Sequence, residues 1–324
     1  MPLNPARLLL LLGLALLAGL ATGGRAQAQS CTFNVTPLVF GPVDVTANVV
    51  TEATATVSVT CTGLLTLPVT VGVCIDFGPG SAGAASATDR YMVNGSNILR
   101  YGLYTAGGVT PWGSSAWPGG GAAPVGFNLN PPIGGSVTRT ETLVGRVHAG
   151  QPTAAPLAYN SVLSGIDARI RYGALSFLLG CDLLTATQTI SFSVAATVPP
   201  TCRVTASTLD FGSTGVLSSA RDASSTLAPT CTNGTSYHIG LNGGLSGASD
   251  PTLRRMVKGG ESVIYGLYRD PARGQAFGST QGVDTVAGTG TGLAQALSVY
   301  GRVPAQATPS PGAYSDTVVA TITY

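Results

Sequence analysis

The sequence predicts an all-β protein that contains two copies of one domain. Residues 31–41 and 202–212 each begin with a Cys and reach a Phe-Gly pair at the same spacing, and a second Cys follows each opening. The tetrapeptide Tyr-Gly-Leu-Tyr also occurs twice, at residues 101–104 and 265–268. A self-match at one long offset indicates a duplicated domain rather than a short-period solenoid.

Short runs rich in Thr and Val alternate apolar with polar residues in both copies. Residues 53–61 and much of residues 317–324 show this period of two, which is typical of half-buried β-strands. Gly, Pro and Asn-Gly pairs separate such runs, and no segment after residue 28 keeps a helical period. We therefore predict two tandem β-sandwiches of immunoglobulin-like architecture, joined at Pro199 and Pro200.

The amino terminus predicts export. Arg7 precedes an apolar run over residues 8–21, and small residues at positions 26 and 28 fit a cleavage site. This pattern is typical of a secretory signal peptide and is too short for a transmembrane anchor. We expect a signal peptide over residues 1–28, a first domain over residues 29–200 and a second domain over residues 201–324.

The cysteines predict a disulfide framework. All six follow the expected cleavage site, and an even number of cysteines in an exported chain indicates disulfides. Two pairs occupy equivalent positions in the two copies, so the remaining two cysteines are left to bridge each other within the first copy. The predicted disulfides are Cys31–Cys61, Cys202–Cys231 and Cys74–Cys181.

Composition and motifs argue against catalysis and nucleic-acid binding. Charged residues make up 9% of the chain and the net charge is +2, so a basic surface for phosphates is not expected. The two histidines, His148 and His238, stand at non-equivalent positions of the two copies. The sequence has neither a nucleophile elbow nor a spacing suited to metal ligands. We predict that the protein is not an enzyme and has no catalytic, cofactor-binding or metal-binding residues.

Taken in order, these motifs resemble the spore coat protein U domain, the pilin module of archaic chaperone–usher pili. Both copies have the Cys to Phe-Gly opening, the second Cys, the Tyr-x-Leu-Tyr element and an Arg near a Met, namely Arg90 with Met92 and Arg255 with Met256. The closing segment over residues 312–324 also fits the family's signature. The first copy departs from that signature, because Ser161 stands where the second copy has Asp316.

The resemblance implies a sandwich that lacks its last strand, with a groove that a strand of the next subunit fills. The sequence of the second copy ends at Tyr324, where its last strand closes, so we expect its groove to be open. Alternate positions of that last strand, Val318, Ala320 and Ile322, are the expected lining of the acceptor groove.

The first copy continues into a further apolar–polar alternation over residues 190–198. We expect this segment, through Ile190, Phe192 and Val194, to complete the first domain in cis. Only Gln29 and Ser30 lie between the expected cleavage site and Cys31, so we expect the chain to donate no strand of its own.

Some apolar segments of the first copy are candidates for contact with a surface. A Gly-rich insertion over residues 111–121 holds both tryptophans, Trp112 and Trp117, although aromatic residues of a long loop are also often buried. Phe177 and Leu178 have no counterpart in the second copy and are further candidates. Leu64 and Leu65 could join this contact surface, but the core is the preferred interpretation for them.

These expectations together describe a pilus tip adhesin that mediates attachment to surfaces and biofilm formation. The resemblance implies a periplasmic chaperone, an outer-membrane usher and an adjacent pilin subunit as partners, with an abiotic or host surface as the target. The route would lead through the periplasm of a Gram-negative bacterium to the cell surface. The alternative is a secreted structural coat or matrix protein that uses the same domain without a fibre.

Overall fold

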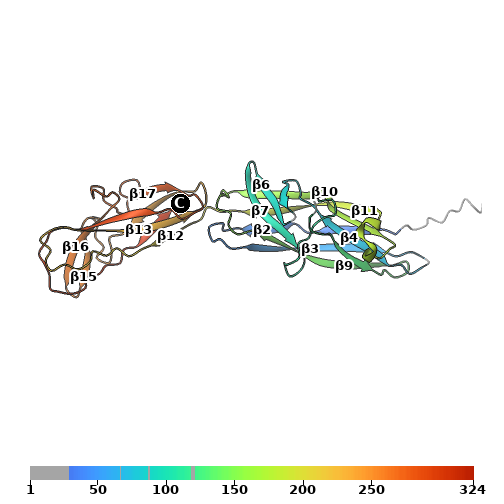
Figure 1. Ribbon diagram of the computed structural model, residues 1–324, viewed down its shortest axis with the longest axis horizontal. Coiled ribbons are helices and arrows are strands. Elements are labelled where there is room, and N and C mark those ends of the chain that lie inside the picture. The colour runs from blue at the N-terminus through green and yellow to red at the C-terminus, as the bar shows by residue number, and fades with distance from the viewer. Residues whose placement is uncertain (1–28, 66, 87, 118–120) are drawn as a thin grey trace, which may run out of the picture.

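The computed structural model describes residues 29–65, 67–86, 88–117 and 121–324, which form two β-sandwiches arranged end to end (Figure 1). The expected signal peptide, residues 1–28, lies outside the described residues. Within the described ranges, no helix has the length and apolar character needed to cross a membrane. The all-β class predicted from the sequence is confirmed, and two short 3-10 turns interrupt it.

The described residues of the first sandwich form eleven strands. They are β1 (Cys31–Val35), β2 (Leu38–Pro42), β3 (Thr51–Thr62), β4 (Val71–Phe77), β5 (Ala84–Ser86), β6 (Asp89–Asn94), β7 (Asn97–Tyr104), β8 (Val125–Leu129), β9 (Ser136–Val147), β10 (Ala158–Gly173) and β11 (Ala186–Thr197). The hydrogen-bonded order is β1-β3-β9-β7-β6-β10-β11-β2, while β4 pairs with β10 and β8, and β5 pairs with β6. The 3-10 turns η1 (Phe177–Leu179) and η2 (Cys181–Leu183) lie between β10 and β11.

Period-two patterning explains why these segments are strands. In β3, Val57, Val59 and Cys61 are buried, and the Thr and Ser residues between them face outward. β10 is longer than its counterpart in the second domain, and its register with β11 shifts between Ser164 and Arg169. The extra residues of the first closing segment therefore form a bulge. Because of this bulge, β10 pairs with β11 along its whole length and with β4 at one end.

The second sandwich is smaller. Its strands are β12 (Cys202–Ala206), β13 (Arg221–Cys231), β14 (Ser236–Leu241), β15 (Arg254–Lys258), β16 (Glu261–Tyr268), β17 (Val286–Thr289), β18 (Leu297–Val303) and β19 (Ala320–Thr323). A five-stranded sheet, β12-β13-β18-β16-β15, faces a three-stranded sheet, β17-β14-β19. Tyr237, Ile239, Phe277 and Val299 are among the buried residues of its core.

The duplication extends to side-chain hydrogen bonds. The side-chain amide of Gln151 accepts a hydrogen bond from the N–H of Arg100 and donates one to its carbonyl. The side-chain amide of Gln306 makes the same two bonds to Ile264. The buried guanidinium of Arg90 donates to the carbonyls of Phe77, Gly78 and Trp112, and that of Arg254 donates to the carbonyls of Leu241, Asn242 and Phe277. The match of Arg90 with Arg255 is therefore wrong: Arg254 is the counterpart, and Arg255 points to solvent on the opposite side of β15.

The three predicted disulfides are confirmed. Cys31–Cys61 and Cys202–Cys231 each join the first strand of a domain to the strand beside it, at directly paired positions. Cys74–Cys181 instead ties β4 to the segment between β10 and β11. This third bridge has no counterpart in the second domain.

Polar contacts join the two sandwiches beside Pro199 and Pro200. The Arg203 guanidinium pairs with the Asp44 carboxylate at 2.8 Å, and the Asn233 side chain donates to the carbonyl of Thr153 at 3.1 Å. The first contact links β12 to the segment after β2, and the second links the segment after β13 to the segment after β9.

Candidate functional sites: an open groove and an apolar end

The last strand of the first domain, β11, is fully built into its core. It pairs antiparallel with β10, where Phe192 lies opposite Leu163 and Val194 opposite Ser161, and parallel with β2, where Val194 lies opposite Leu38. Phe192 and Val194 are buried and Ile190 is partly buried against the same cluster. The ring of Phe192 also meets Phe77 edge to face at 5.4 Å. The expected cis-completing segment therefore lies between β10 and β2 of its own sandwich.

In the second domain the corresponding place is empty. Leu209 and Phe211 take the positions of Leu38 and Phe40, because each pair packs against the Gly of a Gly-Arg-Val element, Gly301 or Gly145. Residues 313–323 take the position of β10, and the second domain, which is described without a gap, has no strand between them. Two adjoining cavities of about 560 and 580 Å³ open there, and Leu209, Phe211, Met256 and Tyr314 line both.

The inward face of the last segment can be assigned from burial. The even-numbered residues from 314 to 322 are half-buried, and the odd-numbered ones are exposed. Val318 and Ala320 line one of the cavities together with Asp316. Ile322 shares their face but lies further along β19, opposite Ile239, and packs against the core without lining either cavity. The structure thus brings Val318 and Ala320 together in the groove and places Ile322 beyond it.

A second candidate site lies at the end of the first domain that faces away from the second domain (Figure 1). Three segments meet there, between β3 and β4, between β8 and β9, and between β10 and β11. The Gly134 N–H donates to the carbonyl of Leu64, and the Phe177 N–H donates to the Asn128 side chain. The exposed apolar side chains of these segments, each 45–77% exposed, are Leu65, Leu67, Ile133, Leu175, Leu178, Leu179 and Leu183.

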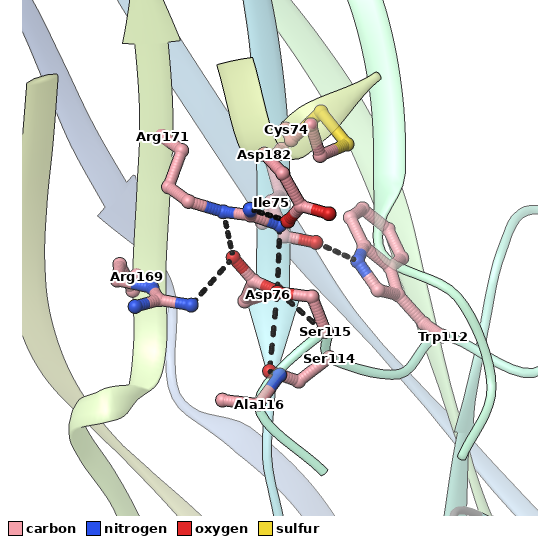
Figure 2. A network of polar contacts seen from close by, with 11 residues as sticks. Cys74, Ile75, Asp76, Trp112, Ser114, Ser115, Ala116, Arg169, Arg171 and Asp182 are labelled. Atoms are coloured by element: carbon pink, nitrogen blue, oxygen red, sulfur yellow. Dashed lines mark hydrogen bonds and ion pairs between the residues drawn. A yellow bond between two sulfur atoms is a disulfide. The ribbon is translucent and has the colours of Figure 1, made fainter. Parts of the chain in front are cut away.

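An ion pair to β10 and a disulfide to β4 hold the third of these segments against the sandwich (Figure 2). Asp76, at 0% exposure, accepts from the guanidinium groups of Arg169 and Arg171, and Arg171 also pairs with Asp182 at 2.8 Å. Cys181, next to Asp182, is bonded to Cys74 of β4. An ion pair and a disulfide at neighbouring positions therefore fix the apolar segment to the sandwich.

The expectation that Trp112 contacts an external surface is wrong. Trp112 is 1% exposed, its indole N–H donates to the carbonyl of Ile75, and its ring packs on Phe77 at 5.0 Å. The carboxylate of Asp76 accepts from Ser114 and Ser115, so the tryptophan segment is pinned over β4 (Figure 2).

Trp117 is half-buried, and the guanidinium of Arg90 lies 4.9 Å from its ring centroid. The tryptophan segment bonds to Phe77, six positions along β4 from Val71, where the apolar end begins. At about 3.3 Å per residue, Phe77 lies roughly 20 Å along β4 from Val71 but only roughly 10 Å from Cys74, which is bonded to Cys181. The tryptophan segment therefore adjoins the segment between β10 and β11, but Trp112 is buried and is not part of the exposed apolar end.

Of the two other candidates, Leu178 is exposed at the apolar end and Phe177 is half-buried with its ring against Gly126. Sequence reasoning missed most of the apolar end, and it assigned Leu65 to the core although that side chain is 56% exposed. One signal was available: Leu and Ile residues stand beside Pro and Gly between strands, where polar turn residues are the rule. The histidines lie outside both sites, with His148 bonded to the carbonyl of Thr88 and His238 on β14.

Two pilin-type sandwiches in tandem, the second of them one strand short, define the class of protein to which this fold belongs. The chain is a member of the Spore Coat Protein U domain family, whose model matches residues 19–164 and 188–321. It is 35% identical over 155 residues to Protein U of Myxococcus xanthus, a match that spans 43% of this chain and 86% of that protein.

Among solved structures, the chain is similar to one in the CsuC–CsuE chaperone–tip adhesion subunit pre-assembly complex from archaic chaperone–usher pili of Acinetobacter baumannii. The TM-score is 0.51 at 13% sequence identity, and the match covers 91% of this chain and 100% of the other. At this identity the similarity concerns the fold.

Proposed function

We propose that this protein is the tip adhesin of an archaic chaperone–usher pilus. The observation that carries the proposal is the asymmetry between the two domains: β11 occupies the groove of the first sandwich, and the same groove of the second sandwich is open. A subunit of this kind can accept a strand at one end and present a finished domain at the other. Its fibre partner would be the adjacent pilin, joined by strand addition.

A periplasmic chaperone and an outer-membrane usher complete the proposed pathway. The apolar groove exposes core residues, which favour aggregation unless a chaperone strand covers them before the pilin strand does. The chain would then pass through the periplasm to the surface of a Gram-negative cell. The complex named above, in which a chaperone accompanies a tip adhesion subunit, is consistent with this order of events.

The apolar end of the first domain is the proposed contact surface. It lies opposite the groove-bearing domain, so a fibre attached at the groove would present this end outermost (Figure 1). Seven exposed Leu and Ile side chains on three segments at one end of the domain suit an abiotic or host surface of apolar character. This contact would support attachment and biofilm formation.

A peptide with the sequence of residues 186–198 tests the groove. The groove of the second domain presents Leu209, Tyr314 and Val318 where the first presents Leu38, Tyr159 and Leu163, so this peptide should bind the intact protein with one-to-one stoichiometry. Fluorescence anisotropy of the labelled peptide is the measurement, and a peptide with Asp in place of Phe192 and Val194 is the control. Failure of the natural peptide to bind, with the protein folded, would favour a coat or matrix protein over a fibre subunit.

Replacing Leu178 and Leu179 by Ser should reduce attachment of piliated cells to polystyrene on the order of tenfold or more. Burial of an exposed Leu contributes about 1.5–3 kcal/mol, and each 1.4 kcal/mol corresponds to a factor of ten. Crystal-violet staining of adherent cells measures the effect, with pilus amount checked on immunoblots.

The matched control is Val109→Ser, because Val109 is exposed in the segment between β7 and β8, away from the apolar end. Equal attachment of the leucine variant and this control would remove the apolar end from the proposal.

A further inference from the structure

Asp316 lies in the wall of the open groove and bonds to three parts of the second domain. Its carboxylate accepts from the hydroxyl of Tyr265 at 2.6 Å, from the N–H of Leu245 at 2.8 Å and from the N–H of Thr317 at 2.8 Å. Tyr265 belongs to β16, Leu245 to the segment between β14 and β15, and Thr317 to the last segment. One side chain therefore connects β16 and the last segment, which both line the groove, to the segment between β14 and β15.

The counterpart of Asp316 in the filled groove is Ser161. Both residues lie against a left-handed Gly, Gly80 with φ 79° or Gly244 with φ 70°, where an added Cβ would meet the Ser161 hydroxyl or the Asp316 carboxylate. Ser161 is buried and lies directly opposite Val194 of β11. The chain thus carries Ser where a strand is present and Asp where the groove is open.

The backbone hydrogen bonds next to Ser161 and Asp316 also differ between the two domains. In the first domain the N–H of Ser81 donates to the carbonyl of Val162, which belongs to β10. In the second domain Leu245 takes the place of Ser81, and its N–H donates to the carboxylate of Asp316 instead. The second domain therefore has a charge-assisted bond to a side chain where the first domain has a backbone bond between β10 and the segment that contains Ser81.

The physical difference favours Asp in an empty groove. Hydrogen bonds to a carboxylate are roughly twice as strong as neutral ones, and a half-exposed carboxylate keeps part of its hydration. Burial, and after it the bond to Asp316, raise the pKa of Tyr265, so its hydroxyl stays protonated as a donor. The nearby Arg254 guanidinium adds a favourable charge. In the first domain, carboxylate bonds of this kind are not required to hold the segment around Ser161, because β11 pairs with β10 along its length.

We propose that Asp316 is a positioning residue of the acceptor groove, which holds the groove wall in place while the groove is empty. This inference rests on the proposed function and adds a residue that sets how readily the groove is filled. Once a strand has bound, the wall is held by strand pairing and Asp316 contributes little.

The test uses the full chain and the labelled peptide of residues 186–198. Asp316→Ser, which copies the first domain, should lower the stability of the empty protein and leave that of the complex nearly unchanged. Because unfolding and binding form a closed thermodynamic cycle, the peptide should then bind about tenfold more tightly, the scale expected for one hydrogen bond to a charged group. Asp316→Asn should lie between Asp316→Ser and the unchanged protein, because its amide oxygen still accepts one bond. In protein that already carries Asp316→Ser, the further change Tyr265→Phe should alter peptide binding little. Thr321→Ala, an exposed position on the outward face of the same segment that lines neither cavity, is the control and should bind normally.

Urea unfolding of the peptide complexes separates positioning from general stability. The complexes of the unchanged protein and of Asp316→Ser should unfold at closely similar midpoints, whereas the free Asp316→Ser protein should unfold earlier than the free unchanged protein. Normal or weaker peptide binding by Asp316→Ser, or an equal loss in the free and bound states, would overturn the inference. If the unchanged protein itself fails to bind the peptide, the proposed function fails instead.

Discussion

Phe192→Ala should destabilise the first domain by about 3–5 kcal/mol, the range measured when a buried Phe is truncated. Phe192 is buried on β11, opposite Leu163 and against Phe77, so its removal leaves a cavity between the two faces of the sandwich. Both tryptophans lie in the first domain, so urea unfolding followed by tryptophan fluorescence reports on that domain alone. The midpoint should fall, and the transition of the second domain, followed by circular dichroism, should not move.

Ser191→Ala is the matched control on the same strand. Ser191 is exposed, and a surface change of this kind is usually within about 0.5 kcal/mol of neutral. A loss for Phe192→Ala no greater than that for Ser191→Ala would show that β11 is not part of the folded core in solution.

Asp76→Ala should destabilise the first domain by about 3–5 kcal/mol, because removal of one partner leaves buried charges without compensation. The carboxylate has no exposed surface and receives Arg169 and Arg171 together with Ser114 and Ser115 (Figure 2). The same tryptophan-monitored unfolding measures the loss. The fluorescence of the folded state should also change, because the Trp112 segment loses its anchor.

Asp89→Ala provides the comparison with an exposed ion pair. Asp89 pairs with Arg100, whose side chain is 45% exposed, and such surface pairs contribute about 0.2–1 kcal/mol. If Asp76→Ala costs no more than Asp89→Ala, the two buried arginines must find other partners, and the proposed anchoring of the apolar segment would be wrong.

Duplication made the framework of this protein readable from its sequence. Cys31–Cys61 and Cys202–Cys231 could be paired because the two copies repeat their spacing, and Cys74 and Cys181 followed by elimination. The alternation of residues 190–198 was visible because β11 has one face in the core and one outside, which gives a period of two. Repetition and periodicity are local signals, and a single sequence carries them in full.

Polar contacts between residues that are far apart in the chain could not be predicted from a local pattern in the sequence. Trp112 stands in a Gly-rich stretch typical of an exposed loop, and only the distant Asp76 and the carbonyl of Ile75 explain why the segment folds inward. The inward face of the last strand was also hidden, because the polar Asp316 shares it with Val318. Burial there depends on Tyr265 and Leu245, which come from other elements.

The Cys74–Cys181 bond has a mechanical consequence. A pull on the second domain reaches the first through Pro199 and Pro200 and acts along the axis of β11, so the hydrogen bonds to β10 and β2 would be loaded in shear and would have to break together. The other end of β11 follows Cys181, which is covalently attached to β4. Tension along the molecule therefore ends in a covalent anchor inside the sandwich, and extraction of β11 would be arrested there even after its hydrogen bonds had yielded.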